Sequence, residues 1–330
     1  MHIQQIVFED LNKIALRETD AELEPGSGEV VVAPAFHGIC GTDLHVLHGK
    51  HPWVRPPLVT GHESAGRIVA LGSDVQGWAL GDQVVVNPLV HCGHCRRCLR
   101  GAFNTCENAR VIGFRLPGTA QTQFVINASQ LHRVPSGLPL DHAVLAEPIA
   151  VGVHAASRFD DLDDVLLIGG GTIGQCVLLG LKARGAGRVT IIEPVAAKRE
   201  LALRLGASDA VAPGTIEATP RFTAAFDVVA AQPTLDLASA AVMGGGCVVV
   251  VGVAPGPMSL PMPRMQRFEI DVRGSGMYLG TDIDTAINLL ATGEINADRL
   301  ISATRCLDEV VEAYADAQLP DSVKVLIRME

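Results

Sequence analysis

The sequence predicts an α/β protein whose second part is a doubly wound parallel sheet and whose first part is rich in short strands and turns. From about residue 148 onward, strand-like and helix-like segments alternate, as expected where helices connect parallel strands. Up to about residue 147, short apolar runs are separated instead by Gly, Pro and Asp. Aromatic residues make up only 4% of the chain, whereas Val, Ala, Leu and Gly are abundant, which favours parallel strands covered by helices.

The individual elements follow from these patterns. In the first part we expect strands at 29–33, 64–71 and 83–87. In the second part we expect strands at 164–168, 188–192, 227–231 and 247–252, and helices at 149–157, 175–184 and 196–205. A last helix at 307–317 precedes a strand at 323–329, which we expect to return to the first domain.

Length, charge and cysteine content limit the possible classes of protein. The chain has 330 residues, which suggests two domains, and its formal net charge is −10. An acidic chain without a basic run longer than Arg96 and Arg97 is a poor nucleic-acid binder. The first ten residues do not resemble a signal peptide, and no apolar run of about 18 residues predicts a membrane span. We therefore expect a cytoplasmic protein whose eight cysteines stay reduced.

Four cysteines with the spacing C-x2-C-x2-C-x7-C predict a structural zinc site. They are Cys92, Cys95, Cys98 and Cys106. Zinc accepts four thiolates in a tetrahedron, and this closed shell leaves no position for a substrate. An iron–sulfur cluster or four free thiols are the alternatives, but the rest of the chain indicates hydride chemistry rather than electron transfer. His91 and His94 lie inside the motif, and we expect them beside the metal or in solvent rather than as ligands.

A second, mixed set of candidate metal ligands is scattered along the first part. Cys40 lies in G-I-C-G-T-D, His62 and Glu63 lie in G-H-E, and Glu147 opens E-P-I-A-V. One thiolate, one imidazole and one or two carboxylates make a shell with room for substrate, as a catalytic zinc requires. Each residue alone could be structural, with Cys40 or His62 in the core and Glu147 as a cap on the helix that follows it.

A glycine-rich turn after the strand expected at 164–168 indicates a dinucleotide site. The motif G-x-G-x-x-G comprises Gly169, Gly171 and Gly174 and encloses Thr172 and Ile173. Its glycines permit the tight turn, the approach of backbone to a pyrophosphate, and the packing of helix on strand. Glu193 ends the next strand, where its carboxylate could accept ribose hydroxyls and repel a 2′-phosphate, which predicts NAD rather than NADP. Lys198 is a further candidate cofactor contact, or lies with Arg199 on a solvated helix face.

These motifs, taken in order, resemble the zinc-dependent medium-chain dehydrogenases, the alcohol and polyol dehydrogenase superfamily, nearly end to end. The resemblance implies a GroES-like β-rich catalytic domain, residues 1–148 and 297–330, and a Rossmann-type NAD-binding domain, residues 149–296. It implies that Cys40 and His62 bind a catalytic zinc, with either Glu63 or Glu147 as the third ligand. Alcohol dehydrogenase itself uses a Cys2His shell. A carboxylate in place of the second cysteine resembles polyol and threonine dehydrogenases, which favours a polyol substrate.

The same resemblance assigns further residues to cofactor and proton transfer. Gly252 and Val253 would lie near the nicotinamide, and Lys324 would offer a cation to the pyrophosphate unless it is a surface lysine. Thr42 and His45 would form a proton relay, unless they are a turn-stabilising side chain and an exposed loop histidine. Zinc would polarise the hydroxyl of a secondary alcohol while NAD accepts the hydride.

The expected substrate is a polyol, a sugar or a cyclitol, with amino alcohols such as threonine and simple alcohols as alternatives. Candidate pocket residues are Trp53, Phe114 and Tyr278. A protein of another class, a zinc-free or non-catalytic NAD(P)H-binding relative, would be expected to lack the metal residues, which are present here. The resemblance also implies a homodimer or homotetramer.

Overall fold

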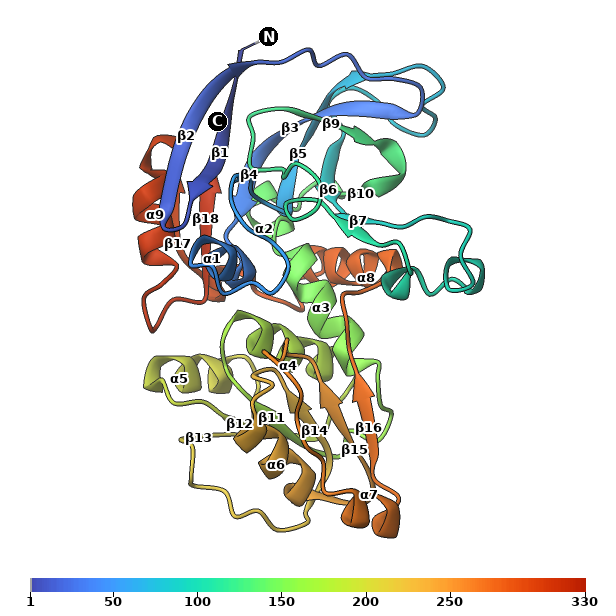
Figure 1. Cartoon of the computed structure of the whole chain (residues 1–330), viewed down its shortest axis with the longest axis vertical. Helices are drawn as coiled ribbons and strands as arrows, with labels where there is room; N and C mark the ends of the chain where they lie inside the picture. Colours follow the sequence, from blue (N-terminus) through green and yellow to red (C-terminus); the bar gives the residue numbers. More distant parts are fainter. Residues whose placement is uncertain (1) are drawn as a thin grey trace. The chain divides into compact units, whose positions relative to one another are not determined.

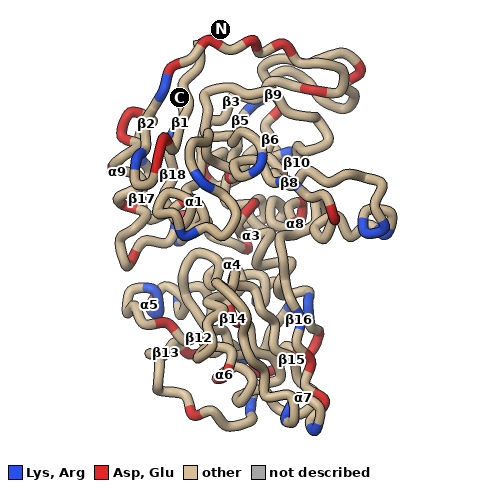
Figure 2. Tube along the Cα trace, in the orientation of Figure 1, with Lys and Arg blue, Asp and Glu red and all other residues tan. Residues whose placement is uncertain are grey.

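The computed structural model describes residues 2–330 as two compact units (Figure 1). The first unit comprises Met1–Glu147 and Leu279–Glu330, and the second comprises Pro148–Tyr278. Acidic and basic residues occur along both units (Figure 2). Among residues 2–330, no helix combines the length and the apolar character that crossing a bilayer would require.

The second boundary differs from the one expected at residue 297. Helix α8 (Gly280–Ala291) belongs to the first unit, where it contacts α2 (Leu140–Ala143) and β10 (Leu131–Arg133). Its Asp284 carboxylate bonds the Nδ1 atom of His132 at 2.7 Å. Helix α8 follows the last strand of the second unit directly, so the sequence order alone suggested the wrong neighbour.

The main sheet of the first unit has seven strands in the order β10-β6-β5-β3-β18-β17, with β9 also paired to β3. Their bounds are β3 Glu29–Gly38, β5 Glu63–Leu71, β6 Gln83–Val86, β9 Phe124–Asn127, β17 Ile301–Cys306 and β18 Lys324–Arg328. The strands expected at 29–33, 64–71 and 83–87 are therefore present. Strand β18 pairs antiparallel with β3, which confirms that the end of the chain returns to the first unit.

Two apolar clusters hold this unit together. One is formed by side chains of β3, β5 and β6 and includes Val30, Val32, Ile68, Val84 and Val86. The other packs helices α1 (Gly41–Leu47) and α9 (Val310–Asp316) on a second sheet and on β18. That second sheet has the order β2-β1-β4, with β1 His2–Asp10, β2 Lys13–Asp20 and β4 Leu58–Val59. Helix α1 begins directly after Cys40, and the burial of its residues Val46 and Leu47 fixes its position in this unit.

The second unit is a six-stranded parallel sheet in the order β13-β12-β11-β14-β15-β16. Its strands are β11 Asp164–Ile168, β12 Arg188–Ile192, β13 Asp209–Val211, β14 Phe222–Asp227, β15 Val242–Val250 and β16 Asp271–Gly274. Its helices are α3 Ala146–Ala156, which starts at the unit boundary, α4 Thr172–Ala183, α5 Ala196–Arg204, α6 Gln232–Ala241 and α7 Met262–Phe268. Separate buried clusters cover the two faces of the sheet, as a doubly wound sheet requires.

One strand of this sheet lies earlier than expected. Strand β14 ends at Asp227 instead of covering 227–231. The buried Asp227 carboxylate accepts the N–H groups of Val229 and Ala230 at 2.9 and 3.0 Å and so bends the chain out of the sheet. Ala230 has a φ of 54°, which strand geometry excludes. The apolar run Val228–Ala231 therefore continues past the strand into a bend, where Ala230 is buried and Val229 is 47% exposed.

Candidate functional site

Cys40, His62 and Glu63 form one group in the first unit, with a ligand atom of each within 4.8 Å of the others. The sheet explains why residues twenty positions apart in the sequence meet. Strands β3 and β5 pair antiparallel, and Gly38 lies opposite Glu63 in the register. Cys40 follows the end of β3, and His62 precedes the start of β5. The two motifs are therefore neighbours at one end of a strand pair.

Asp43 fixes the geometry of this group. Its Oδ2 atom accepts the N–H of Cys40 at 3.1 Å, and its Oδ1 atom accepts the hydroxyl of Thr60 at 3.1 Å. Oδ1 also lies 3.6 Å from Nδ1 of His62. Asp43 is fully buried in the first turn of α1. A carboxylate behind a ligating histidine orients the ring and raises its basicity. The three-residue separation from Cys40 was the signal available in the sequence.

The electrostatics of the group suit a bound cation. Burial by itself lowers the pKa of His62, but Asp43, Cys40 and Glu147 outweigh it and raise the pKa well above the usual range. The buried Nδ1 atom of His62 makes no hydrogen bond within residues 2–330. A thiol, an imidazole and carboxylates in an acidic, mostly buried environment are a donor set that fits zinc.

Glu63 is held by a buried lysine. Both carboxylate oxygens lie 2.7 Å from Nζ of Lys324, which also donates to the carbonyl of Ile39 at 2.9 Å. Burial raises the pKa of Glu63, but Lys324 and His62 more than offset it, so the pKa is lowered. Both side chains are only 1% exposed. This corrects the expectation that Lys324 offers a cation to the pyrophosphate, because its donors are directed at Glu63 and the backbone inside the first unit.

Replacing Lys324 by Met leaves the Glu63 carboxylate buried without its cation. We expect the free energy of unfolding to fall by about 3–5 kcal/mol, the usual cost of removing one partner of a buried pair. Urea unfolding followed by circular dichroism measures it. Lys324→Arg keeps the charge and should lose clearly less. Equal stability of Lys324→Met and the native protein would show that the pair contributes nothing.

The other catalytic candidates lie around this group. Glu147 is buried in the first turn of α3, and its charge reaches His62, although it is not part of the three-residue group. The hydroxyl of Thr42 lies 3.6 Å from the sulfur of Cys40. His45 is exposed in the last turn of α1. Tyr278 is fully buried, which excludes it as a wall of an open pocket, whereas the Phe114 ring lies 5.0 Å from that of His62.

The four cysteines of the predicted structural zinc site also come together, and we call residues 92–106, which contain them, the cysteine lobe. Their sulfur–sulfur separations are 3.6 Å for Cys95–Cys98 and Cys92–Cys106, 3.9 Å for Cys95–Cys106 and 4.0 Å for Cys92–Cys98. A tetrahedron with Zn–S bonds of about 2.3 Å has edges of about 3.8 Å, so this spacing fits zinc. Disulfides would need a sulfur–sulfur distance of about 2.0 Å.

Backbone N–H groups surround these sulfurs. Those of Cys92 and Asn108 lie 3.4 Å from Cys106 Sγ, and that of Cys95 lies 3.4 Å from Cys92 Sγ. N–H donors from His94 and Cys95 lower the pKa of Cys92 to about 6, which favours the thiolate that binds metal. His91 stacks on Phe103, and the His94 ring contacts the carbonyl of Cys92. Neither histidine belongs to the four-sulfur group, in agreement with the expectation.

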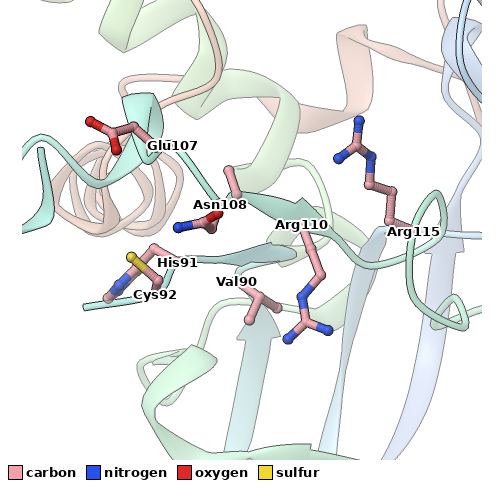
Figure 3. Close-up of a pocket in the computed structure, with 8 residues that line it drawn as sticks. Val90, His91, Cys92, Glu107, Asn108, Arg110 and Arg115 are labelled. Atoms are coloured by element: carbon pink, nitrogen blue, oxygen red, sulfur yellow. The ribbon is translucent and has the colours of Figure 1, made fainter. Parts of the chain in front are cut away.

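A cavity of about 410 Å³ adjoins the lobe, where strands β7 (Leu89–Val90) and β8 (Arg110–Val111) pair (Figure 3). Cys92, Glu107, Arg110 and Arg115 are among its lining residues. The side chains of Cys40, His62 and Glu63 do not line it, so this cavity is distinct from the catalytic group.

The glycine turn in the second unit has the geometry of a phosphate-binding loop. Gly169 has a φ of 101°, and a Cβ there would lie 2.6 Å from the side chain of Val228. A Cβ at Gly174 would lie 2.0 Å from the carbonyl oxygen of Gly169. A Cβ at Gly171 would meet nothing within 4 Å, so the backbone is open at this point, where α4 begins with Thr172 and Ile173. Open backbone at a helix N-terminus is where a pyrophosphate binds.

Glu193 lies against this turn. Its two oxygens accept the N–H groups of Gly170 and Val195 at 2.7 and 2.8 Å. Each carboxylate oxygen has a second lone pair, so ribose hydroxyls can still donate to it. Arg199 donates to the carbonyls of Glu193 and Pro194 and is tied to the backbone. Lys198 is half-buried on α5.

Gly252 and Val253 lie at the same edge of the sheet as the glycine turn. A Cβ on Gly252 would lie 2.8 Å from the carbonyl oxygen of Val228, the residue whose side chain also contacts Gly169. Val253 is 74% exposed at this edge.

Two domains of known protein families match parts of this chain. Residues 26–136 match the alcohol dehydrogenase GroES-like domain, and residues 172–292 match the zinc-binding dehydrogenase domain. The chain belongs to the zinc-dependent medium-chain dehydrogenase superfamily. Among the curated relatives of this dehydrogenase is the 2-dehydro-3-deoxy-L-galactonate 5-dehydrogenase of Pseudoalteromonas atlantica. The two sequences are 32% identical over 92% of this chain and 93% of the relative.

Solved structures show the same fold. An alcohol dehydrogenase from Escherichia coli CFT073 in complex with NADH has a TM-score of 0.92 and 26% identity, over 99% of both chains. A zinc-binding dehydrogenase from Sinorhizobium meliloti 1021 bound to NADP has a TM-score of 0.90 and 29% identity, also over 99% of both chains. This dehydrogenase therefore shares the complete two-unit architecture with proteins that bind either nicotinamide cofactor.

Proposed function

We propose that this dehydrogenase oxidises a secondary alcohol of a polyol, sugar or cyclitol with NAD, at a zinc held by Cys40, His62 and one carboxylate. The observation that carries the proposal is the group of one thiol, one imidazole and one carboxylate within 4.8 Å. A mixed shell of three protein ligands leaves a position for the substrate oxygen, unlike the closed four-sulfur shell of the lobe. The lobe would hold a second, structural zinc.

We assign the third ligand position to Glu63. Glu63 belongs to the ligand group and Glu147 does not. The contacts of Glu63 with Lys324 leave a lone pair on each oxygen for a metal. Glu147 would act from behind His62, where its charge stabilises the positive site.

When bound, zinc would supply Lewis acidity to the substrate hydroxyl, and NAD would accept the hydride. Side chains of the protein would transfer the proton that the substrate hydroxyl releases. We propose that the Thr42 hydroxyl, 3.6 Å from the sulfur of Cys40, takes the proton from the substrate and gives up its own, and that the exposed His45 on the same helix passes a proton to solvent. The Gly169–Gly174 turn would orient the cofactor, with Gly252 and Val253 beside its reactive ring.

A substrate panel tests the proposal directly. Polyols, sugars, cyclitols, amino alcohols and simple alcohols are each incubated with NAD, and the absorbance of reduced nicotinamide is followed. The relative from Pseudoalteromonas atlantica acts on a sugar derivative, which supports the polyol class. Faster oxidation of threonine or of a simple alcohol than of every polyol would contradict the substrate assignment and leave the dehydrogenase chemistry intact.

Cofactor preference depends on Glu193. Replacing Glu193 by Gln removes the charge that would repel a 2′-phosphate and keeps an oxygen acceptor for one of the two N–H groups of Gly170 and Val195. We expect the ratio of NAD to NADP affinity to fall about tenfold, the equivalent of about 1.4 kcal/mol. Titration of cofactor fluorescence measures both dissociation constants. Equal changes for the two cofactors would refute the role of Glu193.

We further propose that this dehydrogenase works in the cytoplasm as a homodimer or homotetramer, which the family resemblance supports. Light scattering on the purified protein distinguishes the two assemblies from a monomer.

A further inference from the structure

The segment between α1 and β4, residues 48–57, brings aromatic and cationic side chains next to the catalytic group. Its backbone is well anchored. The N–H groups of Lys50 and His51 donate to the carbonyl of His45 at 2.7 and 3.0 Å. The N–H groups of Trp53 and Val54 donate to the Nδ1 atom of His51 at 3.3 and 3.1 Å. Val54 is buried in the cluster that also holds α1. The segment is therefore organised before any ligand binds.

A continuous run of rings leads from the metal group to this segment. The ring of Phe114 lies 5.0 Å from that of His62 and is stacked on His51 at 5.5 Å, with 14° between the planes. Trp53 lies edge-on to His51 at 5.8 Å and is 74% exposed. The uncovered indole at the end of this run of rings offers an apolar face on which the C–H groups of a carbon chain can pack.

Arg55 places a positive charge beyond these rings. Its Nη1 atom donates to the carbonyls of His51 and Val54. Within residues 2–330, its Nε and Nη2 atoms make no hydrogen bond, and no carboxylate forms an ion pair with it. Its charge reaches the ring of His51, whose pKa is lowered by burial, by His45 and by Arg55. A planar guanidinium with free donors is suited to bind a carboxylate or a phosphate.

We propose that the substrate is a polyol or sugar with an anionic group, which Arg55 binds while Trp53 packs along the carbon chain. This inference rests on the proposed function for the reacting alcohol and adds the charge at the distant end of the substrate. Arg55 is then a specificity determinant, because it contacts a part of the substrate that does not react. The anion is a carboxylate or a phosphate, since both match the donors of a guanidinium.

The test compares three substrates of one stereochemistry: a neutral alditol, the corresponding aldonate and the corresponding alditol phosphate. We expect the native enzyme to have a kcat/KM at least about tenfold higher for one of the two anions than for the alditol. Arg55→Gln should lose about 10- to 100-fold on that anion, chiefly through KM, and much less on the alditol. Arg55→Lys keeps the positive charge but lacks the planar pair of guanidinium donors, so its kcat/KM on that anion should lie between those of Arg55→Gln and the native enzyme.

Lys50→Gln is the matched control, since it removes the same charge from the same segment. We expect it to change the preference for the anion by less than about twofold, because Lys50 is exposed and its ammonium cannot make the two parallel hydrogen bonds of a guanidinium. The aldonate and phosphate arms identify which anion is recognised. Oxidation of the alditol with no preference for either anion, or equal losses of Arg55→Gln on charged and neutral substrates, would overturn this inference alone. If no polyol of any charge were oxidised, the proposed function would fall with it.

Discussion

Replacing Cys40 by Ser or His62 by Ala is expected to lower kcat/KM at least about 1000-fold, because each variant removes a ligand of the metal that activates the alcohol. Several kcal/mol of transition-state stabilisation depend on that metal, and each 1.36 kcal/mol corresponds to a factor of ten. The dissociation constant for NADH should stay within about twofold of the native value, since the glycine turn belongs to the other compact unit. Steady-state kinetics and cofactor fluorescence measure the two quantities on the same samples.

Cys306→Ser is the matched control, because Cys306 is an exposed cysteine of the same unit that groups with the surface carboxylates of Asp308 and Glu309 and lies outside the Cys40 group. It should keep both turnover and zinc content. Native turnover in either ligand variant, with full zinc content, would contradict the assignment. A protein that contains no zinc at all would instead favour a zinc-free NAD(P)H-binding relative. Zinc analysis of Glu63→Gln beside Glu147→Gln tests the third ligand, and the larger loss is expected for Glu63→Gln.

The sequence indicated that Cys40 and His62 belong together with Glu63 or Glu147, but it did not show which glutamate joins them or how the group is held. Cys40, His62 and Glu63 lie in short motifs with distinctive chemistry, and sheet register then brings them together. The partner of Glu63 is Lys324, which is 261 residues away in the chain. No local pattern distinguishes a lysine that ends in the core from one on the surface. Its burial arises because β18 returns beside β3, and only the assembled sheet shows this contact.

The same contrast applies to the fold. Strands β11 and β12 were predicted at their observed bounds, because each is a short run of buried residues that is fully apolar after Asp164 in β11 and apolar apart from Thr190 after Arg188 in β12. Strand β2 escaped prediction because its side chains are exposed or half-buried and give no alternating pattern. Strand β14 was misplaced because the apolar run after Asp227 continues into a turn. The local hydrogen bonds that the Asp227 carboxylate accepts from Val229 and Ala230, rather than strand propensity, decide where that strand ends.

Replacing Cys98 by Ser is expected to open the cysteine lobe. Between Cys92 and Cys106 the chain forms only two short 3-10 turns, η1 (Cys98–Arg100) and η2 (Phe103–Thr105). Because so little regular structure holds this segment, metal binding would supply most of its folding free energy. The variant should lose one zinc ion per chain and keep the one at Cys40.

Limited trypsin digestion reports the opening of the lobe, because Arg96, Arg97 and Arg100 are exposed cleavage sites inside it. We expect cleavage there to accelerate at least about 100-fold in Cys98→Ser, since local opening controls access of the protease. Cys306→Ser is again the control and should be cleaved at the native rate. A chelator added to the native protein should reproduce the effect of Cys98→Ser. If the variant kept all its zinc, Cys98 would not be a required ligand. If it lost that zinc and still resisted trypsin, the lobe would be stable without a metal, and the structural role of zinc there would be wrong.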